Sequence, residues 1–230
     1  RKKGYMKRRI QDLINSSNYI FEEYLEDKEN KFYTFYKEYD GIVLNKNVPN
    51  LNQNELTNVC FEKYSNLDKL GRCGQVTACI GRERFTTKKR AYIGHIIPSG
   101  WHSLKFNCIQ GKYLYNRCHL IGHQLSGLDI DNNLITGTRY LNISQMLPFE
   151  NAIAGYCRET GNHVLYRVTP IYKQDNLVAF GVLLEALSVE DCGKEICFNI
   201  YLYNRQPEIN IDYKKGYSKE IEFSFSNDII

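Results

Sequence analysis

The chain has 230 residues, of which 43% are hydrophobic and 24% are charged, so it can bury a continuous core and is not collagen-like, low-complexity or wholly disordered. Its 30 basic and 26 acidic residues give a net charge of +4. The longest uncharged apolar runs, such as residues 178–184, are far shorter than the roughly 20 residues that cross a bilayer, so we expect no membrane-spanning segment. No apolar signal-peptide region follows the basic residues 1–9.

The positive charge is concentrated in two blocks. Residues 1–9 carry six basic and no acidic side chains, and residues 82–139 carry nine basic and three acidic ones, whereas acidic groups are in excess elsewhere. Clustered Lys and Arg suit a surface that binds a polyanion, because they displace counterions from phosphates. A solvated charged face would explain the same counts equally well, so charge alone leaves both interpretations open.

The first 40 residues show the periodicity of amphipathic helices. Apolar residues recur at spacings of three and four among Lys and Glu, which predicts one or two helices between Lys7 and about Asp40. The residues of this stripe are Ile10, Leu13, Ile14, Ile20, Phe21, Tyr24 and Leu25. Gly41 ends the run, and the Asn-rich segment 45–58 is typical of a linker. We therefore expect an N-terminal helical extension over residues 1–45 and a second domain over residues 46–230.

Strands are predicted next. Residues 60–64 and 74–80 have strand-like composition, residues 94–111 predict loops between short strands, and Tyr113–Ile121 is rich in β-formers. The last of these carries a cluster of polar residues near its end, which is unusual for a buried strand.

The second half predicts helices followed by a meander. A short helix is expected before Pro148 and a longer one from about Phe149. Three apolar runs bounded by turn residues, 164–172, 178–187 and 196–203, predict consecutive strands. The last 25 residues predict a peripheral strand and a tail.

Eight cysteines are present without any C-x-x-C pair, which argues against a zinc ribbon or a thioredoxin motif. A secreted protein with some disulfides and a cytosolic protein with buried thiols remain equally compatible with this count. The cysteines are Cys60, Cys73, Cys79, Cys108, Cys118, Cys157, Cys192 and Cys197.

Among the five histidines, two stand out. His95, His102 and His163 lie in turn-like contexts, where ordinary hydrogen-bonded surface histidines are expected. His119 and His123 have the spacing of two metal ligands on a helix, but the β-formers before them argue against a helix and therefore against a two-histidine zinc site.

His119 and Arg117 are two residues apart on a predicted strand, so both side chains project to the same face. A neighbouring cation lowers the pKa of an imidazole and keeps it neutral, so that it can accept a proton near pH 7, and a guanidinium suits a phosphate. On this pair alone, a histidine that is merely hydrogen-bonded at a strand end is an equal alternative.

Three sequence blocks carry a resemblance that decides between these alternatives. Residues 115–122 read YNRCHLIG, residues 133–142 read NLITGTRYLN, and residues 146–151 read MLPFEN. In this order they closely resemble the DNA/RNA non-specific endonuclease family, which are ββα-metal (His-Me finger) nucleases, and above all its Gram-positive secreted or surface-attached branch. The likeness extends over about residues 58–205.

The resemblance implies a role for each matching residue. His119 matches the general base of the family's D-R-G-H signature, Arg117 matches its phosphate-facing arginine, and Asn142 matches the single metal ligand that the protein supplies. Asn133 and Glu150 match an Asn nine residues before that ligand and a Glu eight residues after it.

Three further positions complete the implied site. Asn116 and Cys118 stand where the signature has Asp and Gly, and Asn116 is placed with the substrate-binding residues. Arg139 is expected to add phosphate neutralisation, with a solvent-exposed or salt-bridged side chain as an equal alternative.

The resemblance predicts an α+β fold with a central antiparallel sheet and a ββα-metal site laid against it. The implied activity is hydrolysis of DNA, and also of RNA, without sequence preference, with Mg²⁺ as the cofactor, Mn²⁺ as a substitute and 5′-phosphate products. One histidine and one Mg²⁺ provide the base, the charge neutralisation and the leaving-group protonation that a phosphodiester needs. The contacts would be to the nucleic-acid backbone, which carries no sequence information.

Two other functions remain open at this stage. One is a catalytically silent nucleic-acid-binding module on the same scaffold, and the other is the nuclease end of a secreted toxin with a cognate inhibitor. The resemblance implies a secreted or cell-surface protein, and a cytoplasmic one is also compatible with the sequence.

Overall fold

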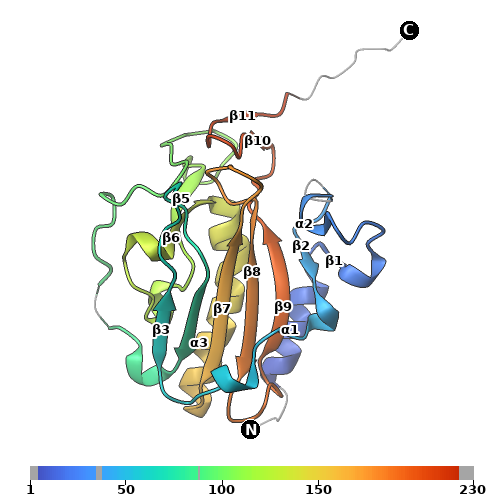
Figure 1. Cartoon of the computed structure of the whole chain (residues 1–230), viewed down its shortest axis with the longest axis vertical. Coiled ribbons are helices and arrows are strands. Elements are labelled where there is room, and N and C mark those ends of the chain that lie inside the picture. The colour runs from blue at the N-terminus through green and yellow to red at the C-terminus, as the bar shows by residue number, and fades with distance from the viewer. Residues whose placement is uncertain (1–4, 35–37, 88, 223–230) are drawn as a thin grey trace.

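A seven-stranded sheet forms the centre of the computed structural model, which describes residues 5–34, 38–87 and 89–222 (Figure 1). The strand order is β1-β2-β9-β8-β7-β4-β3, and every neighbouring pair is antiparallel except the parallel pair β1 and β2. The strands are β1 (Tyr19–Phe21), β2 (Gly41–Val43), β3 (Phe61–Tyr64), β4 (Val76–Ile80), β7 (Val164–Ile171), β8 (Gly181–Ser188) and β9 (Cys197–Tyr203). The expected α+β fold with a central antiparallel sheet is confirmed, as is the meander β7-β8-β9.

One face of this sheet packs against helix α3 (Leu147–Thr160), which lies behind the strands in Figure 1. Side chains alternate between the faces of a strand, and the residues at every second position of β4, β7, β8 and β9 are almost fully buried in one cluster. Helix α1 (Tyr5–Asn15) joins the same cluster through Ile10 and Ile14. The third helix, α2 (Lys31–Thr34), is a single turn.

A second, smaller sheet carries the sequence motif. It is the antiparallel pair β5 (Tyr115–His119) and β6 (Leu134–Thr138), in which His119 is opposite Leu134. A π-helical stretch, Tyr140–Met146, follows β6 and runs directly into α3. Cys118, Ile135 and Leu141 attach this ββα unit to the main core.

The helical stretch is continuous across Pro148, where two separate helices were expected. Pro148 lies in the first turn of α3, where its missing N–H and its fixed φ cost nothing. Residues 94–111 form loops, as expected, and their one isolated bridge joins Lys105 to Tyr113.

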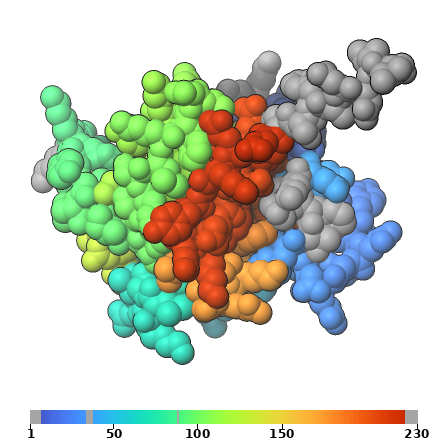
Figure 2. All heavy atoms as spheres, turned by 90° about the horizontal axis from the view of Figure 1, so that it is seen from above, coloured from blue at the N-terminus to red at the C-terminus, as the bar shows by residue number. Residues whose placement is uncertain are grey.

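The end of the described chain packs on the ββα unit. Strands β10 (Ile209–Ile211) and β11 (Ser218–Glu220) form a two-stranded ribbon, and Figure 2 shows this red segment against the green residues near position 110. The hydroxyl of Tyr115 donates to the carbonyl of Gly216 at 2.9 Å, and Ile209 is buried beside Leu114.

The N-terminal segment contains helix α1, the single turn α2 and the strands β1 and β2, so only part of the predicted helical extension is helical. Ile20 and Phe21 form β1 instead of a helix, and Gly41, expected to end a helix, begins β2. A side chain on Gly41 would collide with the carbonyl of Tyr201 on β9, so glycine allows the strand pairing. The short 3₁₀ turns are Glu22–Tyr24, Asn45–Asn47, Gln53–Glu55, Arg82–Arg84, His123–Leu125 and Asp131–Asn133.

We expect Ile42→Ala to destabilise the whole molecule, because Ile42 is 0% exposed and packs between β9 and the N-terminal segment. Truncation of a buried Ile to Ala costs about 2–5 kcal/mol. Urea unfolding should show one transition at lower denaturant, whereas Val48→Ala, at a 51% exposed position, should change little. A separate early transition, with the main one unchanged, would show that residues 1–45 unfold independently.

The structure also bears on membrane spans and on the state of the cysteines. No helix in the described ranges is both long and apolar enough to span a bilayer. All eight cysteines lie in the described part of the chain, and none of them is in a disulfide there.

Candidate active site

His119 lies at the end of β5 with only 5% of its surface exposed. Its Nε2 is 2.7 Å from Oδ1 of Asp129, and its Nδ1 is 2.5 Å from Nη2 of Arg90. A guanidinium can only donate, so Nδ1 is the acceptor and Nε2 carries the proton that it donates to Asp129. The two neighbours therefore fix one neutral tautomer of the imidazole, with its lone pair on Nδ1.

The electrostatic surroundings keep this imidazole uncharged. Burial lowers the pKa of His119 to about 4, and the cation of Arg90 acts in the same direction, while Asp129 partly opposes both. At neutral pH the ring is thus a free base, as general-base catalysis requires.

Arg117, expected to face a phosphate beside His119, makes other contacts. Its Nε donates to the carbonyl of Ile96 at 2.6 Å and its Nη2 donates to the carbonyl of Gly94 at 2.7 Å. Its guanidinium carbon is 4.2 Å from the ring centre of Trp101. The cation beside the imidazole is therefore Arg90, and Arg117 ties the loop at residues 94–101 to β5.

Asn142 lies in the π-helical stretch, a rare geometry that is often found at functional sites. Its Nδ2 donates to Oδ1 of Asn116 at 3.1 Å, and its Oδ1 lies 3.4 Å from the thiol of Cys118. This hydrogen bond to Asn116 fixes the orientation of the Asn142 amide. An Asp at position 116 would offer the same acceptor oxygen, which explains why Asn can replace the Asp of the signature.

Glu150 lies on the first turns of α3 and is 7% exposed. Its carboxylate faces the backbone N–H of Gly122, so closely that any side chain at position 122 would collide with it. Burial raises the pKa of Glu150 to about 8, although the Gly122 N–H and the Arg90 cation lower it. No ion pair to Glu150 is found among the described residues.

Two predicted substrate-binding residues have other surroundings. Asn133 is 0% exposed, and its amide bonds to the N–H and the carbonyl of Ile121 and to the carbonyl of Leu128. Arg139 begins the helical stretch, with its backbone N–H bonded to Leu114 and its guanidinium beside Gly111. Asn133 therefore holds the loop after β5, and the structure does not bring Arg139 into the contacts of His119.

The donor groups fit a hard divalent cation. Asn142 supplies a neutral amide oxygen, and Glu150 supplies a buried carboxyl group that has no ion-pair partner in the described ranges. With a pKa of about 8 this group is mostly protonated at neutral pH, and a cation beside it would favour the carboxylate. Oxygen ligands in small number suit Mg²⁺, which keeps several of its waters. The thiol of Cys118, the residue before His119 on β5, contacts Oδ1 of Asn142, and the carboxyl group of Glu150 contacts the backbone of Gly122, three residues after His119.

Sequence reasoning missed Asp129 and treated Arg90 only as part of a basic block. Asp129 follows His119 by ten residues in a loop, and Arg90 precedes it by 29 residues. Neither spacing has a periodic meaning, so only the folded chain brings these side chains to the imidazole. Lys88 and residues 1–4 of the basic blocks lie outside the described residues.

A family model for DNA/RNA non-specific endonucleases matches residues 50–189. Among solved structures, NucA from Streptococcus agalactiae with a bound magnesium ion is similar, with a TM-score of 0.69 and 25% identity over 78% of this chain and 86% of that chain. Sda1 nuclease with a bound zinc ion has a TM-score of 0.60 and 28% identity, over 68% of this chain and 79% of that chain. A search of curated protein sequences gives no match.

Proposed function

This chain belongs to the family of DNA/RNA non-specific endonucleases, and from that membership we propose that it hydrolyses phosphodiester bonds of DNA, and also of RNA, to 5′-phosphate products. It is a hydrolase of the nuclease class, and the proposal adds the substrate range, the products and the residues. The observation that carries it is the buried neutral imidazole of His119, held between a carboxylate and a guanidinium.

We assign to His119 the role of general base. Its Nδ1 lone pair takes a proton from the attacking water, while the carboxylate of Asp129 holds the Nε2–H and stabilises the imidazolium that forms. Arg90 donates to the same Nδ1. A phosphate would draw this guanidinium to itself, which frees the base and neutralises charge as the substrate arrives.

The cofactor in this proposal is Mg²⁺, with Mn²⁺ as a substitute, and the support is the oxygen donor set together with the magnesium ion bound in the similar NucA structure. A bound divalent cation would supply charge neutralisation at the phosphate and at the leaving oxygen. Asn142 would provide the amide oxygen that holds it. The cation would lower the raised pKa of Glu150, whose carboxylate would then accept hydrogen bonds from the waters of the cation. Asn116 acts on Asn142 as a positioning residue.

The remaining predicted residues are proposed to position loops around the site or to contact the nucleic acid, and not to take part in proton transfer. Arg117 positions the loop at residues 94–101, Asn133 positions the loop that begins at Ile121, and Arg139 stays a candidate for backbone contacts to the nucleic acid. Contacts to phosphates alone give no sequence preference. Secretion or attachment to the cell surface belongs to the same proposal, because the family branch that the motifs resemble has that location.

The test is digestion of supercoiled plasmid and of structured RNA with Mg²⁺, Mn²⁺ or EDTA. We expect nicking and then fragments of all sizes with either metal, no cleavage in EDTA, and ends that ligase can join without prior phosphorylation. Binding of DNA without cleavage under every metal condition would overturn the proposal in favour of a silent binding module.

The acid limb of the pH profile should lie well below that of a free histidine. Because the pKa of His119 is lowered to about 4, the base stays uncharged at pH 5–7 and becomes protonated only as the pH falls through that lower value. At saturating Mg²⁺, log kcat/KM for nicking should therefore be flat from pH 7 to about 5 and fall below it. A limb centred near pH 6.5 would show that the base is a solvated imidazole.

A further inference from the structure

A second group of ligand-type side chains meets at one end of the central sheet. Cys60 immediately precedes β3, Glu83 lies in the 3₁₀ turn after β4, and His163 immediately precedes β7. Since β4 runs antiparallel to both β3 and β7, the last residues of β4 lie beside the first residues of its two neighbours, at the same end of the sheet. No hydrogen bond in the described ranges links this group to His119.

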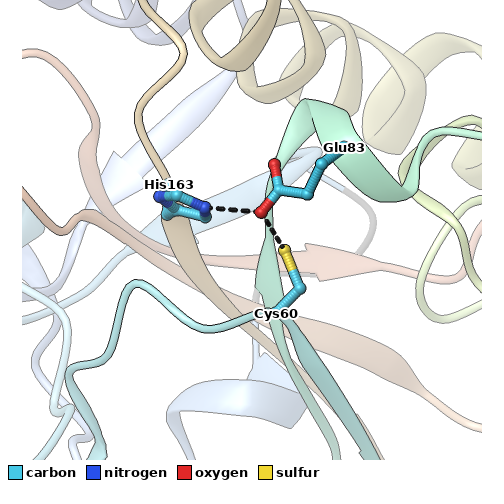
Figure 3. Close-up of side chains that lie close together, drawn as sticks. All are labelled: Cys60, Glu83 and His163. Atoms are coloured by element: carbon cyan, nitrogen blue, oxygen red, sulfur yellow. Dashed lines mark hydrogen bonds and ion pairs between the residues drawn. The ribbon is translucent and has the colours of Figure 1, made fainter.

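The three side chains point toward one another (Figure 3). Oε1 of Glu83 is 3.0 Å from Sγ of Cys60 and 2.7 Å from Nε2 of His163, and the three ligand atoms all lie within 4.8 Å of one another. The edges of a tetrahedral zinc site with ordinary bond lengths are roughly 3.3–3.8 Å. Both hydrogen-bonded separations are shorter than these edges, so the side chains would move slightly apart to admit the ion.

Gly81 leaves the space in which these atoms converge. A Cβ at this position would lie 2.5 Å from Oε2 of Glu83, 2.6 Å from Cδ2 of His163 and 2.7 Å from Sγ of Cys60. Its φ of −143° is ordinary extended backbone that any residue adopts. Glycine at position 81 is therefore explained by the space that the three ligands need and not by backbone conformation.

His163 is also oriented as a metal ligand is. Glu190 lies 2.5 Å from its Nδ1 and accepts from its backbone N–H at 2.8 Å, so the ring is held with Nε2 aimed at the cluster. A carboxylate on the far nitrogen is the usual support of a ligating imidazole, because it fixes the tautomer and raises basicity. The side chain of Glu83 is 51% exposed, which leaves an open side for a water as fourth ligand.

We propose that Cys60, Glu83 and His163 form a zinc site that joins the beginnings of β3 and β7 to the end of β4. One sulfur, one imidazole nitrogen and one carboxylate oxygen are the ligands that Zn²⁺ takes, whereas Mg²⁺ and Ca²⁺ take oxygen alone. On binding, the thiol of Cys60 and the Nε2–H of His163 each lose a proton to solvent, and the hydrogen bonds from these two groups to Glu83 are replaced by bonds from all three side chains to the ion. The site would pin β3, the edge strand of the sheet.

The test uses the full chain, stripped with chelator and then loaded with Co²⁺ as a spectroscopic probe or with Zn²⁺. We expect a sulfur-to-cobalt charge-transfer band, one equivalent of tightly held Zn²⁺, and a melting temperature that rises with Zn²⁺. Cys60→Ser should abolish the band, while Cys192→Ser, at an exposed cysteine, should keep it. Asn142→Ala should also keep it, which separates this site from the one proposed for catalysis.

Glu83→Gln provides a second variant at an exposed position, where loss of folding is not expected. It should keep the sulfur band but weaken Zn²⁺ affinity roughly 10–100-fold. The proposal is overturned if the wild-type chain shows no sulfur-to-cobalt band, if Cys60→Ser leaves the band unchanged, or if peptide mapping finds Cys60 in a disulfide with Cys79 in place of metal. In that case His163 is an imidazole paired with two carboxylates only.

Discussion

Replacement of His119 by alanine is expected to reduce turnover by about 10²–10⁴-fold, the usual contribution of a positioned general base. No other described side chain offers an imidazole lone pair fixed by both a carboxylate and a guanidinium. Folding should be retained, because removal of the neutral ring leaves the opposite charges of Arg90 and Asp129 to face each other. The measurement is the initial rate of plasmid nicking at saturating Mg²⁺, with the circular dichroism spectrum recorded in parallel.

The control is His102→Ala. His102 stacks on Tyr217 at 4.0 Å between ring centres and bonds to the carbonyl of Lys215, so its removal alters a surface contact and not the proposed base. Partial recovery of the His119→Ala rate with added imidazole would support a proton-transfer role. A His119→Ala protein with near-wild-type nicking and the same metal dependence would sink the assignment.

Asn142→Ala should raise the Mg²⁺ concentration needed for half-maximal activity by at least roughly 10–100-fold, because loss of a residue that merely supports a metal ligand already has an effect of that size. The variant loses the proposed ligand oxygen and also the bond to Asn116. DNA affinity measured in EDTA should change much less, because phosphate contacts by Lys and Arg supply most of it. Fluorescence anisotropy with labelled duplex and a Mg²⁺ titration of nicking separate the two effects.

Asn151→Ala is the matched control for this variant. Asn151 is an exposed residue of α3 whose Oδ1 accepts from Gln124 at 2.9 Å, so its loss should leave the titration unchanged. Asn133 is unsuitable as a control, since its fully buried amide holds three backbone groups and its loss would disturb the loop. An unchanged titration for Asn142→Ala, with a shifted one for Asn151→Ala, would move the ligand to position 151.

The strand prediction succeeded where the signal was local. In β7, β8 and β9 a run of apolar residues between turn residues was enough, because pairing of consecutive strands needs only short connections. The prediction for the N-terminal strands was wrong because their pairing is not local. Ile20 and Phe21 continue a helical spacing in the sequence, but β1 pairs with β2, which in turn pairs with β9 near the other end of the chain.

The site residues likewise divide into those that could be predicted from nearby sequence and those that could not. The strand pair, the helical stretch and their motif residues lie within 36 consecutive positions from Tyr115 to Glu150, so the family resemblance of this one segment predicted that His119, Asn142 and Glu150 share a ββα unit. Spacing also paired Arg117 with His119 on one strand face. It could not show that the carbonyls of Gly94 and Ile96 would engage that guanidinium.

By itself, the sequence determined the fold class, the family resemblance and the identity of the proposed base, because each rests on composition or on residues close together in the chain. Only the tertiary structure decided which cation and which carboxylate accompany His119, since Arg90 and Asp129 reach it from two separate loops. The same holds for the convergence of Cys60, Glu83 and His163, which are spread over more than 100 residues. Contacts of this kind depend on how strands pair across the sheet, and pairing between distant segments leaves no periodic pattern in either segment.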